Sequence, residues 1–145
     1  MQIQDLPDEN TWRFVAILNH KIETGRLFNA LGHVTAGLSG GNSGDIEMGF
    51  LQYRDKGGGV HPNISHFPFI VLKADNSNQI RTVRQEAIRR QILFTDFTST
   101  MTVGTSQEQL DVTLATMEPD LEYYGICLFG RTQKLRQFTK KFSIF

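Results

Sequence analysis

Four apolar runs of strand length alternate with amphipathic segments along the chain. The runs are Trp12–Leu18, Phe69–Lys73, Ile92–Asp96 and Tyr123–Phe129. Each run is mostly apolar instead of alternating, which is typical of strands that are buried on both faces. Strands of this kind separated by helices predict a single α/β domain over residues 1–145. We expect three layers (α/β/α) around a mixed, mainly parallel sheet.

The intervening segments carry apolar residues at helical spacing. The predicted helices run from Arg26 to Leu38 (with Leu27, Leu31, Val34 and Leu38 on one face), through Ile80, Val83 and Ala87, from Ser106 to Pro119, and through Leu135, Phe138 and Phe142. In the third helix, Ser106 and Gln109 form a capping box, and Leu110, Leu114 and Met117 supply the apolar face. We therefore expect each helix to turn one face toward the core.

The stretch Phe67–Thr100 has the pattern of one βαβ unit: an apolar run that ends in Lys73, a helical segment, and an apolar run that leads into Asp96. A crossover of this kind brings the carboxyl ends of its two strands to one edge of the sheet. Open α/β sheets tend to place their sites at that edge. The pattern therefore predicts that Lys73 and Asp96 lie together at that edge, and because adjacent strands lie only ~4.8 Å apart, the two side chains would be within reach of an ion pair.

The remaining segments predict flexible or peripheral structure. Residues 1–11 are polar and predict a loose N-terminal arm. The run Ser39–Asp45 lacks the Gly-Lys-Ser/Thr ending of a phosphate-binding loop and is interpreted as a linker. Ile46–Arg54 alternates, and the turn Asp55–Gly59 then leads into Val60–His66, which predicts a β-hairpin.

Composition narrows the functional classes. Fifteen basic and fifteen acidic residues cancel, so the chain has no overall bias toward nucleic acid or a membrane surface. The only cysteine, Cys127, lies in an apolar run and cannot form an internal disulfide, which fits a cytoplasmic protein. No apolar run approaches the ~20 residues that span a bilayer. The polar start Met1–Asp5 is not that of a signal peptide.

Three segments resemble the peptidyl-tRNA hydrolase II fold. They are the strand Phe14–Asn19 with the helix that reaches His33, the strand Ile70–Ala74 with the Asp96-x-x-x-Thr100 spacing, and the strand Tyr124–Gly130 with its closing helix. They cover about half of the chain.

A closer resemblance, over nearly the whole chain, is to an uncharacterised bacterial family called domain of unknown function 2000. The runs that carry this resemblance are His61–Phe69 and Asp96–Met101. That family is grouped with the hydrolase fold and has no settled activity.

The hydrolase resemblance implies catalytic roles for Asp96, Lys73, Thr100 and His33 in cleaving an ester or related acyl bond. In this scheme Asp96 orients or deprotonates a water, Thr100 positions it, and Lys73 stabilises negative charge on the ester oxygen. Arg26 stands where the fold has a lysine and would contact the substrate. The helix at Ser106 is inserted directly after the candidate site, where it would cover or rebuild it.

Structural alternatives remain open for each of these residues. Lys73 and Asp96 can form an ion pair that serves the fold alone. Asp96 is also a residue type that caps helices or accepts hydrogen bonds in turns. Thr98 and Thr100 belong to a hydroxyl-rich run of the kind found in tight turns.

Further binding candidates come from the histidines and from one helix start. Asn29 and His33 share a helix stripe with Arg26, which indicates either a ligand-binding face or ordinary exposed residues. His61 and His66 are substrate-binding candidates, but they lack nearby carboxylates or cysteines at metal-ligand spacing. We therefore expect no metal and, for both histidines, local hydrogen bonds.

Gly130 and Arg131 lie between a buried strand and a helix N-terminus. Free backbone N–H groups at such a position can bind an anion. The alternative is an ordinary strand-to-helix turn.

Two functional hypotheses follow, a hydrolase of an ester or acyl bond and a non-catalytic small-molecule-binding or oligomer-forming domain. We expect no cofactor and no membrane association, and we expect a homodimer. Basic residues gather on the predicted central helix (Arg81, Arg84, Arg89, Arg90) and on the closing one (Arg131, Lys134, Arg136, Lys140, Lys141). The zero net charge nevertheless argues against transfer RNA as a partner.

Overall fold

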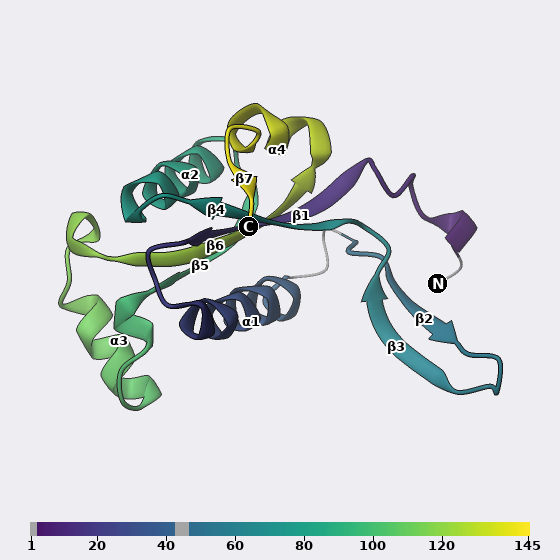
Figure 1. The fold of residues 1–145 in the computed structure, drawn as a ribbon, viewed down its shortest axis with the longest axis horizontal. Helices are drawn as coiled ribbons and strands as arrows, with labels where there is room; N and C mark the ends of the chain where they lie inside the picture. The colour runs from purple at the N-terminus through teal and green to yellow at the C-terminus, as the bar shows by residue number, and fades with distance from the viewer. Residues whose placement is uncertain (1–2, 43–46) are drawn as a thin grey trace.

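Five segments form one sheet in the computed structural model, which describes residues 3–42 and 47–145 (Figure 1). They are β1 (Trp12–Asn19), β4 (Phe69–Ala74), β5 (Leu93–Thr98), β6 (Tyr123–Arg131) and β7 (Ser143–Ile144). The first four correspond to the four apolar runs, so the prediction of the central strands is confirmed. Their order across the sheet is β5-β6-β1-β4-β7.

The sheet is mixed, as predicted, but its pairings are not mainly parallel. Only β1 and β4 pair in parallel, whereas β1–β6, β5–β6 and β4–β7 are antiparallel. The reason is that β6 inserts between β1 and β5 in the opposite direction. Strands β4 and β5 still run the same way, but β1 and β6 lie between them.

Helices cover both faces of this sheet. The helices are α1 (Thr24–Gly40), α2 (Ser77–Arg89), α3 (Ser106–Leu114) and α4 (Thr132–Thr139), with short 3₁₀ turns η1 (Ile3–Asp5), η2 (Ser99–Met101) and η3 (Glu118–Asp120). Figure 1 shows α2 and α4 on one side of the sheet and α1 on the other.

The two faces bury separate apolar clusters, because neighbouring residues of a strand point in opposite directions. Phe14, Phe129 and Leu27 belong to the cluster beneath α1. Val15 and Ile80 belong to the cluster on the α2 and α4 side. The apolar stripes expected on α1 and α2 are confirmed by this packing.

A hairpin of β2 (Phe50–Arg54) and β3 (Val60–Ser65) extends away from the sheet (Figure 1). The Asp55 carboxylate accepts hydrogen bonds from the N–H groups of Gly57 and Gly59, at 2.8 and 3.0 Å, and so closes the turn. The hairpin prediction is confirmed. The start of its first strand, expected at Ile46, and the end of the expected linker (residues 43–45) lie outside the described residues.

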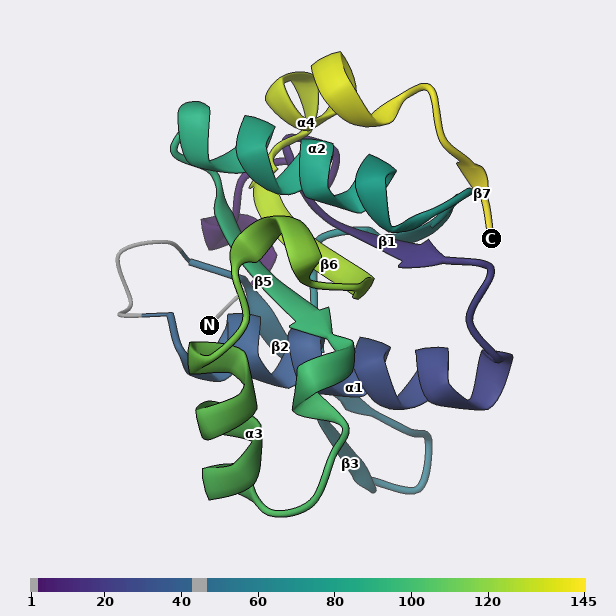
Figure 2. The ribbon, with the colours of Figure 1, turned by 90° about the vertical axis from the view of Figure 1, so that its left-hand side faces the viewer.

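Helix α3 differs from its prediction. Its N-cap is Thr105, whose hydroxyl accepts the N–H of Glu108, and the helix ends at Leu114, well before Pro119. The expected apolar face is not buried: Leu110, Leu114 and Met117 are 65%, 89% and 73% exposed. Helix α3 packs against η2 beside the sheet instead of covering it, as Figure 2 shows.

Candidate functional site

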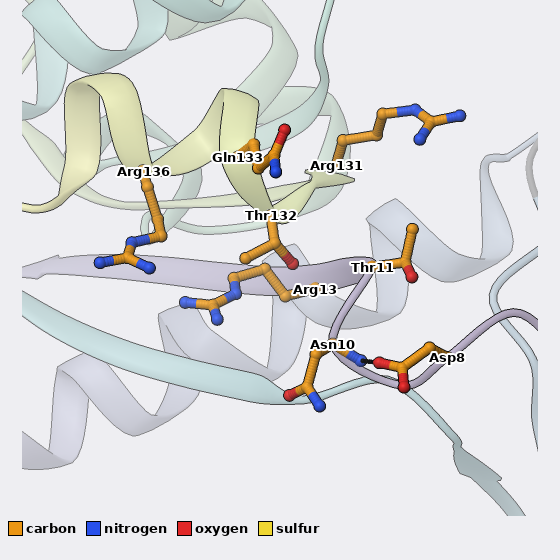
Figure 3. A pocket seen from close by; sticks show the side chains of 8 residues that line it. All are labelled: Asp8, Asn10, Thr11, Arg13, Arg131, Thr132, Gln133 and Arg136. Atoms are coloured by element: carbon orange, nitrogen blue, oxygen red, sulfur yellow. Dashed lines mark hydrogen bonds between the residues drawn. The ribbon is translucent and has the colours of Figure 1, made fainter.

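A pocket of about 540 Å³ lies where β1 begins and where β6 passes into α4 (Figure 3). Its walls are Asp8, Asn10, Thr11, Arg13, Arg131, Thr132, Gln133 and Arg136. All eight lining residues are polar or charged. Three arginines and one aspartate are among them, so the pocket carries a positive formal charge.

Strand pairing brings these walls together from opposite ends of the chain. Strands β1 and β6 are antiparallel, with Trp12 opposite Arg131 and Arg13 opposite Gly130. The backbone N–H of Thr132 donates to the carbonyl oxygen of Thr11 at 2.9 Å, which ties the N-terminal segment to the first residue of α4. The Arg131 guanidinium lies 5.3 Å from the centre of the Trp12 ring.

The charged side chain of Arg13 lies on a face of the sheet that helices cover. It lies two residues before Val15, so both face the side covered by α2 and α4. Burial and the neighbouring positive charge of Arg136 lower the pKa of Arg13 below its usual value. Figure 3 shows the guanidinium groups of Arg13 and Arg136 on the same side of Thr132. The Nε atom of Arg13 is buried and has no hydrogen-bond partner.

Thr132 adds a second unpaired donor at the start of α4. The residue is 8% exposed, and its buried Oγ1 has no hydrogen-bond partner. Arg131 gives the helix no side-chain cap, and the first turn contains no acidic residue. The positive end of the helix dipole is therefore not neutralised from within the helix.

The pocket arginines also lack counter-ions among the described residues. Within residues 3–42 and 47–145, carboxylates lie within 4 Å of Arg26, Arg81, Arg84, Arg89 and Arg90, but of none of the three pocket arginines. Buried polar groups and charges usually have partners, because leaving them unpaired costs free energy. This arrangement can bind an oxyanion through guanidinium, hydroxyl and helix N-terminal donors.

The predicted pairing of Lys73 with Asp96 is wrong. Lys73 aligns across the sheet with Leu18, then Gly125, then Phe97, so three strand spacings, roughly 14 Å, separate β4 from β5. Asp96 precedes Phe97 and points to the opposite face. Both residues lie toward the same end of the sheet, but β1 and β6 keep them apart.

Asp96 has another partner. Its Oδ2 accepts a hydrogen bond from Nε of Arg84 on α2 at 3.1 Å, and the two side chains are 17% and 29% exposed. Burial raises the pKa of Asp96, and the Arg84 charge acts in the opposite direction. Lys73 is exposed and lies in a small pocket with Asp75, Gln79 and Lys141.

Thr98 and Thr100 are buried and form hydrogen bonds with other hydroxyls. Their Oγ1 atoms lie 2.7 Å apart, and the hydroxyl of Thr113 on α3 lies 2.8 Å from Thr100 Oγ1. This chain of hydroxyls links the end of β5, η2 and α3. Thr100 is thus part of the connection between α3 and the sheet, and its hydroxyl contacts Thr98 and Thr113.

The expected stripe on α1 does line a crevice. Arg26, Asn29 and His33 are exposed and share a depression of about 630 Å³ with η2. The His33 ring stacks on Phe97, with ring centroids 5.4 Å apart, and His33 also borders a smaller depression next to Asp96. The grouping of these three residues is confirmed, and their catalytic or binding roles stay predictions.

The expected local hydrogen bond is confirmed for His61, whose Nε2 lies 3.1 Å from Asp55 Oδ2 in the hairpin. It is wrong for His66, whose Nε2 lies 3.0 Å from the carbonyl oxygen of Pro7 in the distant N-terminal segment. No group of three metal-binding side chains occurs in the described part of the chain. Cys127 is fully buried, and burial raises the pKa of its thiol to about 12. None of the described helices is long and apolar enough to cross a membrane.

Sequence reasoning located one edge of the arginine pocket and missed its centre. Gly130 and Arg131 were candidates for an anion site before a helix, with an ordinary strand-to-helix turn as the alternative, and Arg131 does line the pocket. Arg13 and Arg136 were not expected there. The available signal was Arg13 itself, a charged residue inside an apolar strand, since such a residue requires a partner or a ligand.

Residues 12–145 match the model of one protein family, described as Protein of unknown function (DUF2000). A solved structure of a protein of unknown function from Agrobacterium tumefaciens strain C58 superposes with a TM-score of 0.77 at 18% identity, covering 93% of this chain and 98% of that one. This likeness concerns the fold alone. No curated protein matches the sequence. A peptidyl-tRNA hydrolase II-like fold stays a prediction.

Proposed function

The chain belongs to the DUF2000 family, whose function is unknown, and from its own residues we propose that it is a small-molecule-binding protein. Its ligand presents an oxyanion to Arg13, Thr132 and Arg136. One observation carries this proposal: two neighbouring guanidinium groups share a pocket in which no described carboxylate pairs with either. In addition, two buried donors, Nε of Arg13 and Oγ1 of Thr132, have no hydrogen-bond partner.

An anion bound beside the guanidinium groups would balance their positive charges. Two like charges repel each other, and burial increases the penalty for each unpaired donor. A bound oxyanion would accept hydrogen bonds from both guanidinium groups. Charge-assisted hydrogen bonds of this type are about twice as strong as neutral ones.

Nucleic acid is a weaker candidate. The three arginines of α2 and its C-cap residue Arg90 all form ion pairs: Arg81 with Glu118, Arg84 with Asp96, and Arg89 and Arg90 with Glu86. The hydrogen bonds from Arg89 and Arg90 lower the pKa of Glu86 to about 2. A helix whose positive charges are neutralised in this way offers little attraction to a phosphate backbone.

We expect inorganic phosphate to bind wild-type protein, and Arg136→Gln to weaken that binding by about 10-fold or more, because one charge-assisted hydrogen bond is worth ~1.5–3 kcal/mol. Isothermal titration calorimetry at low ionic strength measures both affinities. Arg136 is exposed, so its loss should not unfold the chain. Arg13→Gln tests the more buried member of the pair.

Arg26→Gln is the matched control, because it removes the same charge from α1, outside the pocket. It should leave phosphate affinity within 2-fold of wild type. Equal weakening by Arg26→Gln and Arg136→Gln would indicate a general charge effect and contradict the site. Absence of phosphate binding in wild type at millimolar concentration would contradict the proposal itself.

The hydrolase hypothesis has lost the lysine–aspartate pair on which it was based. We expect Asp96→Asn to leave any hydrolysis of acylated transfer RNA or simple acyl esters unchanged, since the Asp96 carboxylate forms an ion pair with Arg84. Initial rates of wild type and variant at pH 7 provide the measurement. A loss of about 100-fold, the size expected for removing a general base, would restore the hypothesis.

A further inference from the structure

We infer that the ligand of the arginine pocket is a phosphate monoester of a hydroxylated carbon body, such as a sugar or polyol phosphate. This inference rests on the proposed function and adds the ligand class. Two features of the pocket carry it: the charge at its cationic end, and the polar N-terminal segment that forms its other wall.

The cationic end matches a dianion. Arg13 and Arg136 supply two neighbouring positive charges, and Arg131 adds a third at the border. A carboxylate group is planar and carries one negative charge, so it would balance the charge of only one guanidinium group. A phosphate monoester carries about −1.5 to −2 at pH 7 and has three acceptor oxygens. These oxygens match the guanidinium groups and the Thr132 hydroxyl.

The pocket is larger than its anion requires. Its volume of about 540 Å³ falls within the roughly 300–1,000 Å³ range of small-molecule sites. The remaining space borders Asp8, Asn10, Thr11 and Gln133. Neither an aromatic nor an aliphatic side chain lines it, so stacking of a nucleobase and insertion of an acyl chain both lack a surface. The wall favours a hydrophilic body.

The chemistry of this wall distinguishes hydroxyl groups from other polar groups. Asp8 uses Oδ1 to accept the Asn10 N–H at 2.8 Å, which leaves its other oxygen able to accept from a ligand. The amides of Asn10 and Gln133 and the hydroxyl of Thr11 both donate and accept hydrogen bonds. Hydroxyl groups also do both, whereas an ammonium group only donates. Figure 3 shows Asp8 and Asn10 below Thr11, away from Arg136.

Calorimetric titrations of the full chain test the inference with five probes: inorganic phosphate, glucose 6-phosphate, hexyl phosphate, gluconate and phosphoethanolamine. We expect glucose 6-phosphate to bind at least 10-fold more tightly than inorganic phosphate and than each of the other three. Asp8→Asn should weaken glucose 6-phosphate by about 3- to 10-fold. The same substitution should leave inorganic phosphate unchanged or slightly tighter, because it removes a negative charge from the pocket.

Each alternative outcome has a definite meaning. Equal affinities for glucose 6-phosphate, hexyl phosphate and inorganic phosphate would contradict the inference that the ligand has a hydroxylated body. The proposed anion site would remain supported. Tighter binding of phosphoethanolamine would overturn it in favour of an ammonium-bearing ligand, and tighter binding of gluconate would overturn the phosphate monoester. No binding of inorganic phosphate or of any phosphate ester would overturn the proposed function together with this inference. Asp8 lies in the N-terminal segment outside the core, so Asp8→Asn should fold normally.

Discussion

Phe129→Ala will lower the free energy of unfolding by about 3–5 kcal/mol, the usual cost of removing a buried phenylalanine from a core. Phe129 is fully buried in the central strand β6. Its ring contacts Trp12, Phe14 and Phe67, with centroid separations of 5.6, 4.5 and 5.8 Å. Truncation would leave a cavity that joins three aromatic rings. Urea denaturation followed by circular dichroism measures the change.

Phe28→Ala is the control for Phe129→Ala, because Phe28 lies on the outer face of α1 and is 66% exposed. Its substitution should change the free energy of unfolding by less than about 0.5 kcal/mol. If Phe129→Ala does not fold, Phe129→Leu provides the measurement, with an expected cost of about 1–2 kcal/mol. A cost below 0.5 kcal/mol for both Phe129 variants would contradict the described packing of the α1 side of the sheet.

The strands and most helices could be predicted because their patterns are local. An uninterrupted apolar run such as Tyr123–Phe129 is stable only where both faces are covered, and β6 is buried almost throughout. Similarly, Ile80, Val83 and Ala87 at helical spacing require one buried face, and α2 supplies it. Such patterns determine which element forms, and they contain little information on its neighbours.

The strand order could not be predicted for this reason. The βαβ pattern of Phe67–Thr100 fixes the direction of β4 and β5 but leaves open how many strands lie between them. Two strands, β6 and β1, lie between β5 and β4, and they separate Asp96 from Lys73. A site hypothesis built on neighbouring strands therefore depended on long-range pairing, which the local pattern does not specify.

The exposure of the apolar residues of α3 could not be predicted for a different reason. Its apolar residues occur at helical spacing, and the pattern assumes that the core supplies a surface to cover them. In this chain α3 packs against η2, and Leu110, Leu114 and Met117 stay exposed. An amphipathic pattern predicts a buried face without identifying what buries it. The homodimer and the cytoplasmic location also stay predictions, because a single chain does not test them.

The arginine pocket could be predicted only in part, because it depends both on long-range strand pairing and on what surrounds each side chain. Gly130 and Arg131 could be assigned to a helix N-terminus from local sequence. Arg13 lies more than one hundred residues earlier in the chain, and it reaches the same place only through the antiparallel pairing of β1 with β6. The clustering of charges thus follows from the sheet, and the unpaired donors become apparent only when their surroundings are known.

Arg84→Met will lower the free energy of unfolding by about 2–4 kcal/mol at pH 7, because it leaves the mostly buried Asp96 carboxylate without its partner. Burial already raises the pKa of Asp96 against the opposing effect of Arg84, so removing Arg84 raises it further. A carboxyl group whose pKa is higher in the folded state binds more protons there than in the unfolded chain. Its destabilising effect therefore shrinks as the pH falls through the raised pKa and disappears below the unfolded value.

Urea denaturation at pH 7 and at pH 5 tests this sign, because the cost of Arg84→Met should be smaller at pH 5. In an Asp96→Asn background the same substitution should cost less than about 1 kcal/mol, since no charge is left unpaired. Arg26→Met, on an exposed face of α1, controls for the general effect of removing an arginine. Equal costs at both pH values and in both backgrounds would mean that Asp96 is solvated without Arg84. Asp96 would then be free to act as a base, and the principal structural argument against a hydrolase would fail.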